Sequence, residues 1–188
     1  MKSNNKKRIF IGIAVNRKIK PLLTILKSTV NCNHNQIKWM PNANIHLTLS
    51  YIGNVKNKDI SHLIKSFEKK ILSNNFKITI EGAGVFPSFT SPKVLWLGIG
   101  KGLDELRSIQ YKVEKSIRKF KDNSQKITYT PHITIARIQK LHWKIDVLPF
   151  LNTVYSPIEL DVNSIYLYES LLLAKGAQYK LLNTFPLN

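Results

Sequence analysis

The stretch TPHITIAR at residues 130–137 repeats much of an earlier stretch, NIHLTLSY at residues 44–51. Each places a histidine two residues before a threonine and surrounds both with aliphatic side chains. Residues two apart on a β-strand point to the same face. Each stretch therefore predicts a strand with an imidazole and a hydroxyl on one face and aliphatic residues on the other.

The segments around the two motifs follow the same order in both halves of the chain. Alternating patterns predict strands, and apolar residues at helical spacing predict helices. The predicted strands are 9–15, 44–53, 75–86, 93–100, 126–138, 162–172 and 177–185, and the predicted helices are 21–30, 59–72 and 103–120, with a short helix or turn at 143–151. We expect a single domain over residues 1–188, built from two β-α-β-α-β units at roughly 8–86 and 93–188 that are free to exchange strands. Their pseudo-two-fold relation would bring the two motifs face to face.

The composition is that of a folded globular protein with a strong positive charge. Hydrophobic residues make up 43% of the chain and charged residues 21%, which argues against a disordered or membrane protein. The 29 lysines and arginines outnumber the 11 acidic residues and give a net charge of +18. Such a field attracts polyanions, so RNA, DNA and an anionic membrane surface are candidate partners. A drift towards lysine without any partner is the alternative.

The single cysteine, Cys32, excludes an internal disulfide and a cysteine-cluster zinc site, and it fits a reducing compartment. Basic residues before the apolar run 9–15 resemble a signal peptide, but the run is short and no small-residue cleavage site follows it. No segment approaches the length of a membrane span. We expect a cytoplasmic protein with no membrane partner.

Two imidazoles that face each other across a groove form an acid-base pair that works near neutral pH. Such a pair suits phosphodiester hydrolysis, because one neutral histidine takes a proton from attacking water while one protonated histidine gives a proton to the departing oxygen. From the residues alone, His46 and His132 are interchangeable in these roles. The hydroxyls of Thr48 and Thr134 would donate hydrogen bonds to the non-bridging phosphate oxygens.

Arg137 offers a further cation for the same oxygens. Strand alternation places Arg137 on the face opposite His132, unless the strand ends or bulges before it. A single histidine on a strand is more often a structural residue, but two matched copies favour a site. The remaining histidines, His34, His62 and His142, have no such matched partner.

A metal site is the main alternative chemistry for paired histidines. Neither motif has an Asp or Glu at ligand spacing, so we expect no metal. The chain also lacks the glycine-rich loops of ATP and dinucleotide sites, so we expect no cofactor.

With both motifs and their flanks considered together, the chain resembles the two-histidine (2H) phosphoesterase superfamily, and within it the RNA 2',3'-cyclic phosphodiesterases, also called 2'-5' RNA ligases. The resemblance rests on RIFIGIAV, IKWMPNANIHLTLSYIG, GAGVFPSFTSPKVLWLGI, YTPHITIARI and YLYESLLLAKGAQYKLLNTFPL, in this order. It implies a bilobal α+β fold in which two antiparallel sheets surround a central groove and the helices lie outside.

The same resemblance implies metal-independent hydrolysis of RNA 2',3'-cyclic phosphate ends to 2'-phosphates, with reverse 2'-5' ligation. It assigns His46 as proton donor and His132 as proton acceptor, and it assigns Thr48, Thr134 and Arg137 to phosphate binding. Two aromatic residues near the motifs, Trp39 and Phe86, are candidates to stack on terminal bases.

The substrate stays open at this point. RNA with 2',3'-cyclic phosphate ends, including tRNA fragments, is the expected partner of a monomeric enzyme. Hydrolysis of a small cyclic phosphate and non-catalytic binding of RNA ends are the alternatives.

Overall fold

A computed structural model describes residues 5–15, 17–32, 36–70, 73–121, 128–139, 145–174 and 176–188. The strands are β1 (Lys6–Ala14), β2 (Ile37–Trp39), β3 (His46–Lys56), β4 (Phe76–Phe86), β5 (Val94–Ile99), β6 (Ile133–Ile138), β7 (Ile158–Val162), β8 (Ser164–Leu173) and β9 (Gly176–Pro186). The helices are α1 (Lys20–Ser28), α2 (Ile60–Lys70), α3 (Leu103–Ile117) and α4 (Leu148–Leu151), with single 3-10 turns at Arg17–Ile19, Asn42–Asn44 and Asn57–Asp59.

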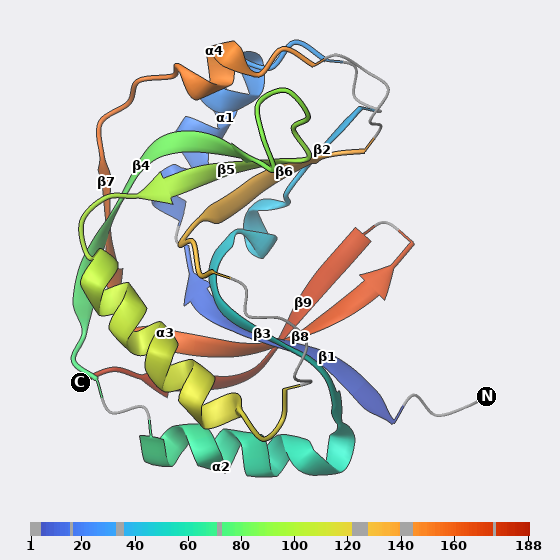
Figure 1. The fold of residues 1–188 in the computed structure, drawn as a ribbon, viewed down its shortest axis with the longest axis vertical. Helices are drawn as coiled ribbons and strands as arrows, with labels where there is room; N and C mark the ends of the chain where they lie inside the picture. The colour runs from blue at the N-terminus through green and yellow to red at the C-terminus, as the bar shows by residue number, and fades with distance from the viewer. Residues whose placement is uncertain are drawn as a thin grey trace.

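The strands form two antiparallel halves that meet at one residue pair. Strands β3, β1, β8 and β9 are neighbours in this order, and α2 and α3 cover them; we call this part the His46 lobe. Strands β7, β4, β5 and β6 form the His132 lobe, with β2 beside β6 and with α1 and α4 on its outer side (Figure 1). Leu47 of β3 pairs with Ile133 of β6 and joins the two lobes. The expected bilobal α+β fold with antiparallel sheets and outer helices is confirmed.

The two lobes are not the two halves of the chain. Strand β4 and helix α1 belong to the first half of the sequence but lie in the His132 lobe, whereas α3, β8 and β9 belong to the second half and lie in the His46 lobe (Figure 1). This exchange makes each lobe depend on both halves of the sequence.

The sequence patterns missed two strands and misplaced the start of another. Strand β2 has three residues, too few for an alternation to be recognised, and β7 pairs with the exposed edge of β4 through a short IELDV segment. Strand β6 begins at Ile133, so His132 stands immediately before the strand.

The core lies between the sheets and the helices. Along β1, Ile9, Ile11 and Ile13 are buried on the helix side, while Phe10 and Gly12 face the other way, into the groove between the lobes. The buried helix residues that meet these strands include Leu63 and Phe67 of α2 and Leu106 and Val113 of α3. The alternation thus separates a packed face from a face available for chemistry. Within the described part of the chain, no helix is both long and apolar enough to cross a membrane.

Candidate active site

His46 is the first residue of β3, and two hydrogen bonds hold its ring. Its Nδ1 lies 2.7 Å from the backbone oxygen of Asn44, which can only accept, so Nδ1 carries a hydrogen. Its Nε2 lies 3.0 Å from the hydroxyl oxygen of Thr48. In the neutral ring Nε2 therefore accepts a hydrogen bond from the Thr48 hydroxyl. In the protonated ring Nε2 carries the proton that can be donated.

His132 repeats the first of these contacts. Its Nδ1 lies 2.7 Å from the backbone oxygen of Thr130, again two residues earlier in the chain. The same tautomer is therefore fixed at both sites, and Nε2 of His132 is free to accept a proton. The hydroxyl of Thr134 has no hydrogen-bond partner among the residues that the structure describes.

The register of β3 and β6 brings the two motifs together. Leu47 and Ile133, the residues between histidine and threonine in each motif, are direct partners. Continued on either side, this register sets Thr134 opposite His46 and His132 opposite Thr48. The two histidines are then diagonal neighbours, at a spacing of roughly 7–8 Å between backbones in a regular ladder. The two imidazoles therefore belong to the same face of the sheet.

The electrostatic environment lowers the pKa of both histidines. Burial is the larger cause for each pKa, opposed by the hydrogen bond to the backbone carbonyl, and the positive charge of Arg137 lowers both pKa values further. His132 also lowers the pKa of His46, which shows that the two rings lie within electrostatic range of each other. An anion bound between the rings would counter these effects and favour protonation.

A β-bulge turns Arg137 to the side of the histidines. Trp96 pairs with Thr134, and the next residue back, Leu95, pairs with Ala136, so β6 has one extra residue at this point. Ile135 and Ala136 are in consequence both buried, at 1% and 0% exposure. Arg137 returns to the face of Thr134, in agreement with its effect on both histidine pKa values.

Aromatic rings form the walls on both sides of the histidines, and most were not anticipated from the sequence. Phe10 lies 4.8 Å and Tyr179 5.1 Å from the His46 ring, measured between centroids. Phe86 lies 5.0 Å from the His132 ring in an edge-to-face contact and stacks on Trp96 at 5.0 Å. Two sequence features could have indicated these rings. Tyrosines recur near the end of the chain, and Gly84 leaves space for the Trp96 ring, which a Cβ at that position would occupy.

A hollow of about 430 Å³ opens beside His46. Its lining comes from the end of β1, the turn before β3, and the rings of Tyr168 and Tyr179. The site therefore combines an acid-base pair, free hydroxyl and guanidinium donors, and an adjoining cavity of the size of a small ligand.

Comparison with known proteins agrees with this geometry. The sequence model of the 2'-5' RNA ligase superfamily matches residues 21–172. The chain belongs to the 2'-5' RNA ligase superfamily. A relative from Aquifex aeolicus, named RNA 2',3'-cyclic phosphodiesterase, is 29% identical over 96% of this chain and 97% of its own length. A relative of the same name from Aeropyrum pernix is 32% identical over 78% of this chain and 84% of its own length.

Solved structures share the fold. A Thermus thermophilus protein superposes with a TM-score of 0.76 at 21% identity and covers 95% of this chain and 97% of its own. E. coli LigT complexed with 3'-AMP also superposes with a TM-score of 0.76, at 19% identity, over 97% of this chain and 98% of its own.

This member of the superfamily separates the two aromatic residues that the sequence suggested for base stacking. Phe86 lies against His132. Trp39 pairs with Ala136 on the buried side of the sheet, and the ammonium of Lys27 on α1 lies 5.9 Å from its ring centre. The structure thus brings His46, Thr48, His132, Thr134, Arg137 and Phe86 together and does not bring Trp39 to them.

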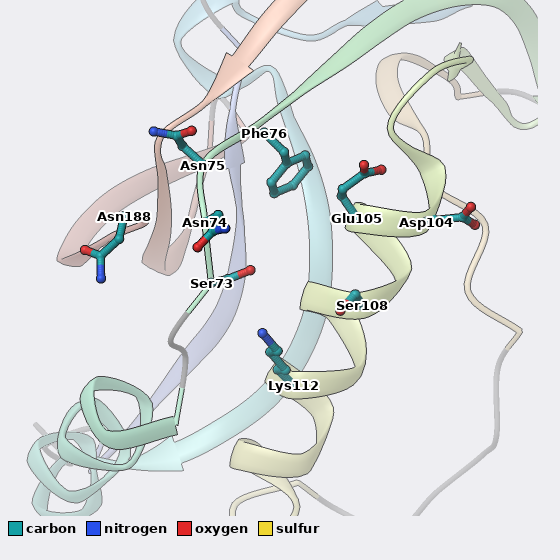
Figure 2. A pocket seen from close by; sticks show the side chains of 9 residues that line it. All are labelled: Ser73, Asn74, Asn75, Phe76, Asp104, Glu105, Ser108, Lys112 and Asn188. Carbon is teal, nitrogen blue, oxygen red and sulfur yellow. The ribbon is translucent and has the colours of Figure 1, made fainter.

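His62 and a second cavity lie away from this site. His62 is exposed on α2, and His34 and His142 fall outside the described residues. A hollow of about 700 Å³ lies between α3 and the segment that leads into β4, with Glu105 and Lys112 on one side and Asn74 on the other (Figure 2). It contains neither motif. Among the described residues, no three His, Cys, Asp or Glu side chains gather as a metal site.

Proposed function

We propose that this chain is an RNA 2',3'-cyclic phosphodiesterase that opens the cyclic end to a 2'-phosphate by acid-base catalysis between His46 and His132. The observation that carries the proposal is the Leu47–Ile133 pair, which joins the two motifs, each with a histidine whose Nδ1 is held by a backbone oxygen. The relatives from Aquifex aeolicus and Aeropyrum pernix carry this activity in their names.

In the proposed reaction, water attacks phosphorus from the His132 side. Nε2 of His132 takes a proton from the water as its oxygen bonds to phosphorus. The bond between phosphorus and the 3'-oxygen breaks, and His46 gives its Nε2 proton to that oxygen, which leaves as the 3'-hydroxyl. The product keeps the phosphate on the 2'-oxygen, and proton exchange with solvent resets both rings. The direction of attack follows the superfamily resemblance. With a 5'-hydroxyl in place of water, the same displacement joins the cyclic end to that hydroxyl through a 2'-5' linkage and again frees the 3'-hydroxyl.

Threonine and arginine donors stabilise the developing charge in this scheme. The Thr134 hydroxyl has no partner within the described part of the chain. The Thr48 hydroxyl is released when His46 is protonated, because Nε2 then no longer accepts its hydrogen bond. Arg137 lies on the same face as the histidines. These three donors can follow the non-bridging oxygens as charge builds on them. The ring of Phe86, beside His132, is placed to contact a base or ribose on that side.

RNA is favoured over a small cyclic phosphate by charge. The net charge of +18 exceeds what a single phosphate needs, and it would hold the backbone that precedes a cyclic end. We expect RNA ends, tRNA fragments among them, to be processed by a monomer in the cytoplasm, where a single reduced cysteine is the ordinary state.

The test is hydrolysis of a short RNA with a 2',3'-cyclic phosphate end, in EDTA, by wild type and by His46→Ala and His132→Ala. We expect a 2'-phosphate product, resistance to EDTA, and a loss of about 10²–10⁴-fold in each variant. Loss of activity in EDTA would point to a metal site instead. No turnover by wild type, with RNA binding intact in both variants, would make the chain an RNA-end binder. Equal rates on RNA and on a cyclic mononucleotide, both insensitive to salt, would favour the small substrate.

A further inference from the structure

The His46 lobe has a position that corresponds to Arg137 in the His132 lobe. Strand β3 bulges after its motif as β6 does: Thr48 pairs with Gly12, Ser50 pairs with Ile11, and Leu49 is the extra residue. Leu49 and Ser50 are both buried, at 1% and 5% exposure. The next residue, Tyr51, therefore returns to the groove face. Tyr51 follows His46 by the same five residues by which Arg137 follows His132.

Tyr51 brings an arginine to this position from the neighbouring strand. Arg8 of β1 donates a hydrogen bond from Nε to the Tyr51 hydroxyl at 2.9 Å, and its guanidinium carbon lies 5.7 Å from the centre of the Tyr51 ring. Arg8 has the same strand parity as Phe10 and Gly12, which contact His46, so it lies on the groove side. Because Nε is occupied by the tyrosine, the two terminal nitrogens of the fork remain as donors.

Both arginines act on the same tyrosine, Tyr179. Burial raises the pKa of Tyr179, and the positive charges of Arg137 and Arg8 both oppose this rise, so both guanidinium groups lie within electrostatic range of its hydroxyl. Tyr179 also contacts His46 and Phe10. Tyr179 therefore contacts one catalytic histidine and lies within electrostatic range of both arginines.

The position of Arg8 is more informative about its ligand than the absence of a carboxylate partner. Among the described residues no carboxylate pairs with Arg8 or Arg137, but with 29 basic and 11 acidic side chains many cations share this state. Ala14, the strand partner of His46, lies six residues from Arg8 on β1, about 20 Å along the strand at 3.3 Å per residue. This backbone distance exceeds what one phosphate and the two side chains span together. Arg8 is therefore available to an anion other than the one between the histidines.

We infer that Arg8, oriented by Tyr51, binds the internucleotide phosphate that joins the terminal nucleoside to its 5' neighbour in an RNA substrate. The inference rests on the proposed function and adds a second anion position to it. A guanidinium fork with both terminal nitrogens available matches the two non-bridging oxygens of a phosphodiester. The half-buried ring of Tyr179, which packs on the buried Phe10 and on His46, is the aromatic surface available to the terminal nucleoside.

The test compares two trinucleotides with a 2',3'-cyclic phosphate end. One has an ordinary phosphodiester next to the terminal nucleoside, and the other has an uncharged methylphosphonate at that linkage. For wild type we expect kcat/KM to favour the charged linkage by roughly 10- to 100-fold, the usual value of a charge-assisted bidentate contact. In Arg8→Gln this preference should fall close to one, and in Tyr51→Phe it should fall part of the way.

The preference ratio is internal to each enzyme, so a partly misfolded preparation alters both substrates alike. The matched control is Arg107→Gln, which removes the same charge from the outer helix α3, where Arg107 lies 3.5 Å from Asp104. It should keep the wild-type ratio. The slope of log kcat/KM against log salt should also become shallower by about 0.7 in Arg8→Gln. In the control the slope should change only slightly.

Two results separate failure of this inference from failure of the proposed function. If wild type opens neither trinucleotide, the proposed function is wrong. If wild type opens both and Arg8→Gln keeps the wild-type preference for the charged linkage, or if wild type shows no preference, then Arg8 does not bind this phosphate.

Discussion

The hydroxyl of Tyr129 donates a hydrogen bond to the backbone oxygen of Thr48 at 3.3 Å. Tyr129 lies three residues before His132, whereas Thr48 lies two residues after His46. This bond therefore ties the segment that carries one histidine to the strand that carries the other. Burial raises the pKa of Tyr129 well above its ordinary value, so the hydroxyl keeps its proton, and this bond, at any working pH. Together with the Leu47–Ile133 pair, it sets the separation of the two rings.

Tyr129→Phe should lower kcat about tenfold and leave KM nearly unchanged, because it loosens the spacing of the histidines without removing a group that binds substrate. The free energy of unfolding should fall by about 1 kcal/mol, the usual value of one such bond. Tyr155→Phe is the matched control, since the Tyr155 hydroxyl donates to the backbone oxygen of Gly82 at 2.8 Å. It should cost similar stability in urea unfolding and leave kcat intact. Equal kcat losses in both variants would refute a positioning role for Tyr129.

Thr48→Val and Thr134→Val should differ in the kinetic parameter they change. Thr48 contacts His46 Nε2 as well as facing the phosphate, so its loss should lower kcat by about 10- to 100-fold. The Thr134 hydroxyl has no partner among the described residues, and its loss should mainly weaken binding of inorganic phosphate and of the 2'-phosphate product, about tenfold. Inhibition constants for inorganic phosphate and for the 2'-phosphate product, measured together with kcat, distinguish the two effects. Identical profiles for the two variants would mean that the threonines act as equivalents.

The pH profile of kcat/KM should be bell-shaped with its maximum below pH ~6.5, because the pKa of each histidine lies below that ordinary value. Arg137→Gln removes a positive charge that opposes protonation, so both pKa values should rise and the maximum should move to higher pH. The activity of this variant should also fall through weaker phosphate binding. NMR titration of the histidine ring protons checks the pKa values without turnover. An unmoved or downward-shifted titration would show that Arg137 does not act on the rings.

Gly12→Ala should destabilise the protein and impair the site together. A Cβ at Gly12 would lie 2.6 Å from the backbone oxygen of Leu47 and 3.4 Å from Cδ2 of His46. The strand that carries His46 must shift, at a cost of about 1–3 kcal/mol in the free energy of unfolding. Gly102→Ala, at the turn before α3, also sets a Cβ against a backbone oxygen, that of Lys77, and adds strain because Gly102 has a φ of +82°. Urea unfolding should show a loss for both variants, and only Gly12→Ala should lower kcat. A fully active Gly12→Ala enzyme would contradict this account.

Most of the helices and strands and the duplication of the motif could be predicted from the sequence, because both depend on local patterns. The alternation of Ile9, Ile11 and Ile13 fixes which face of β1 is buried, and the repeated histidine and threonine fix a polar face on β3 and before β6. The duplicated motif can also be recognised from short stretches of sequence, because each copy is defined by neighbouring residues. These features require no knowledge of which strands become neighbours.

The partners of each strand, by contrast, were decided by the tertiary structure. The extra residues at Leu49 and Ile135 arise from the pairing of β3 with β1 and of β6 with β5, and they reverse the side on which Tyr51 and Arg137 lie. The sequence alone allowed Arg137 on either face. Strand pairing also exchanges β4 and β8 between the lobes and turns Trp39 towards α1.

The sequence by itself therefore determined the chemistry available to this protein, two imidazoles and two hydroxyls on strands with a buried back. Only the tertiary structure decided which further groups share their face, including Arg137, Tyr179 and the Arg8–Tyr51 pair. The physical reason is that side-chain direction alternates with every residue along a strand, so a single bulge set by a neighbouring strand redirects all that follows.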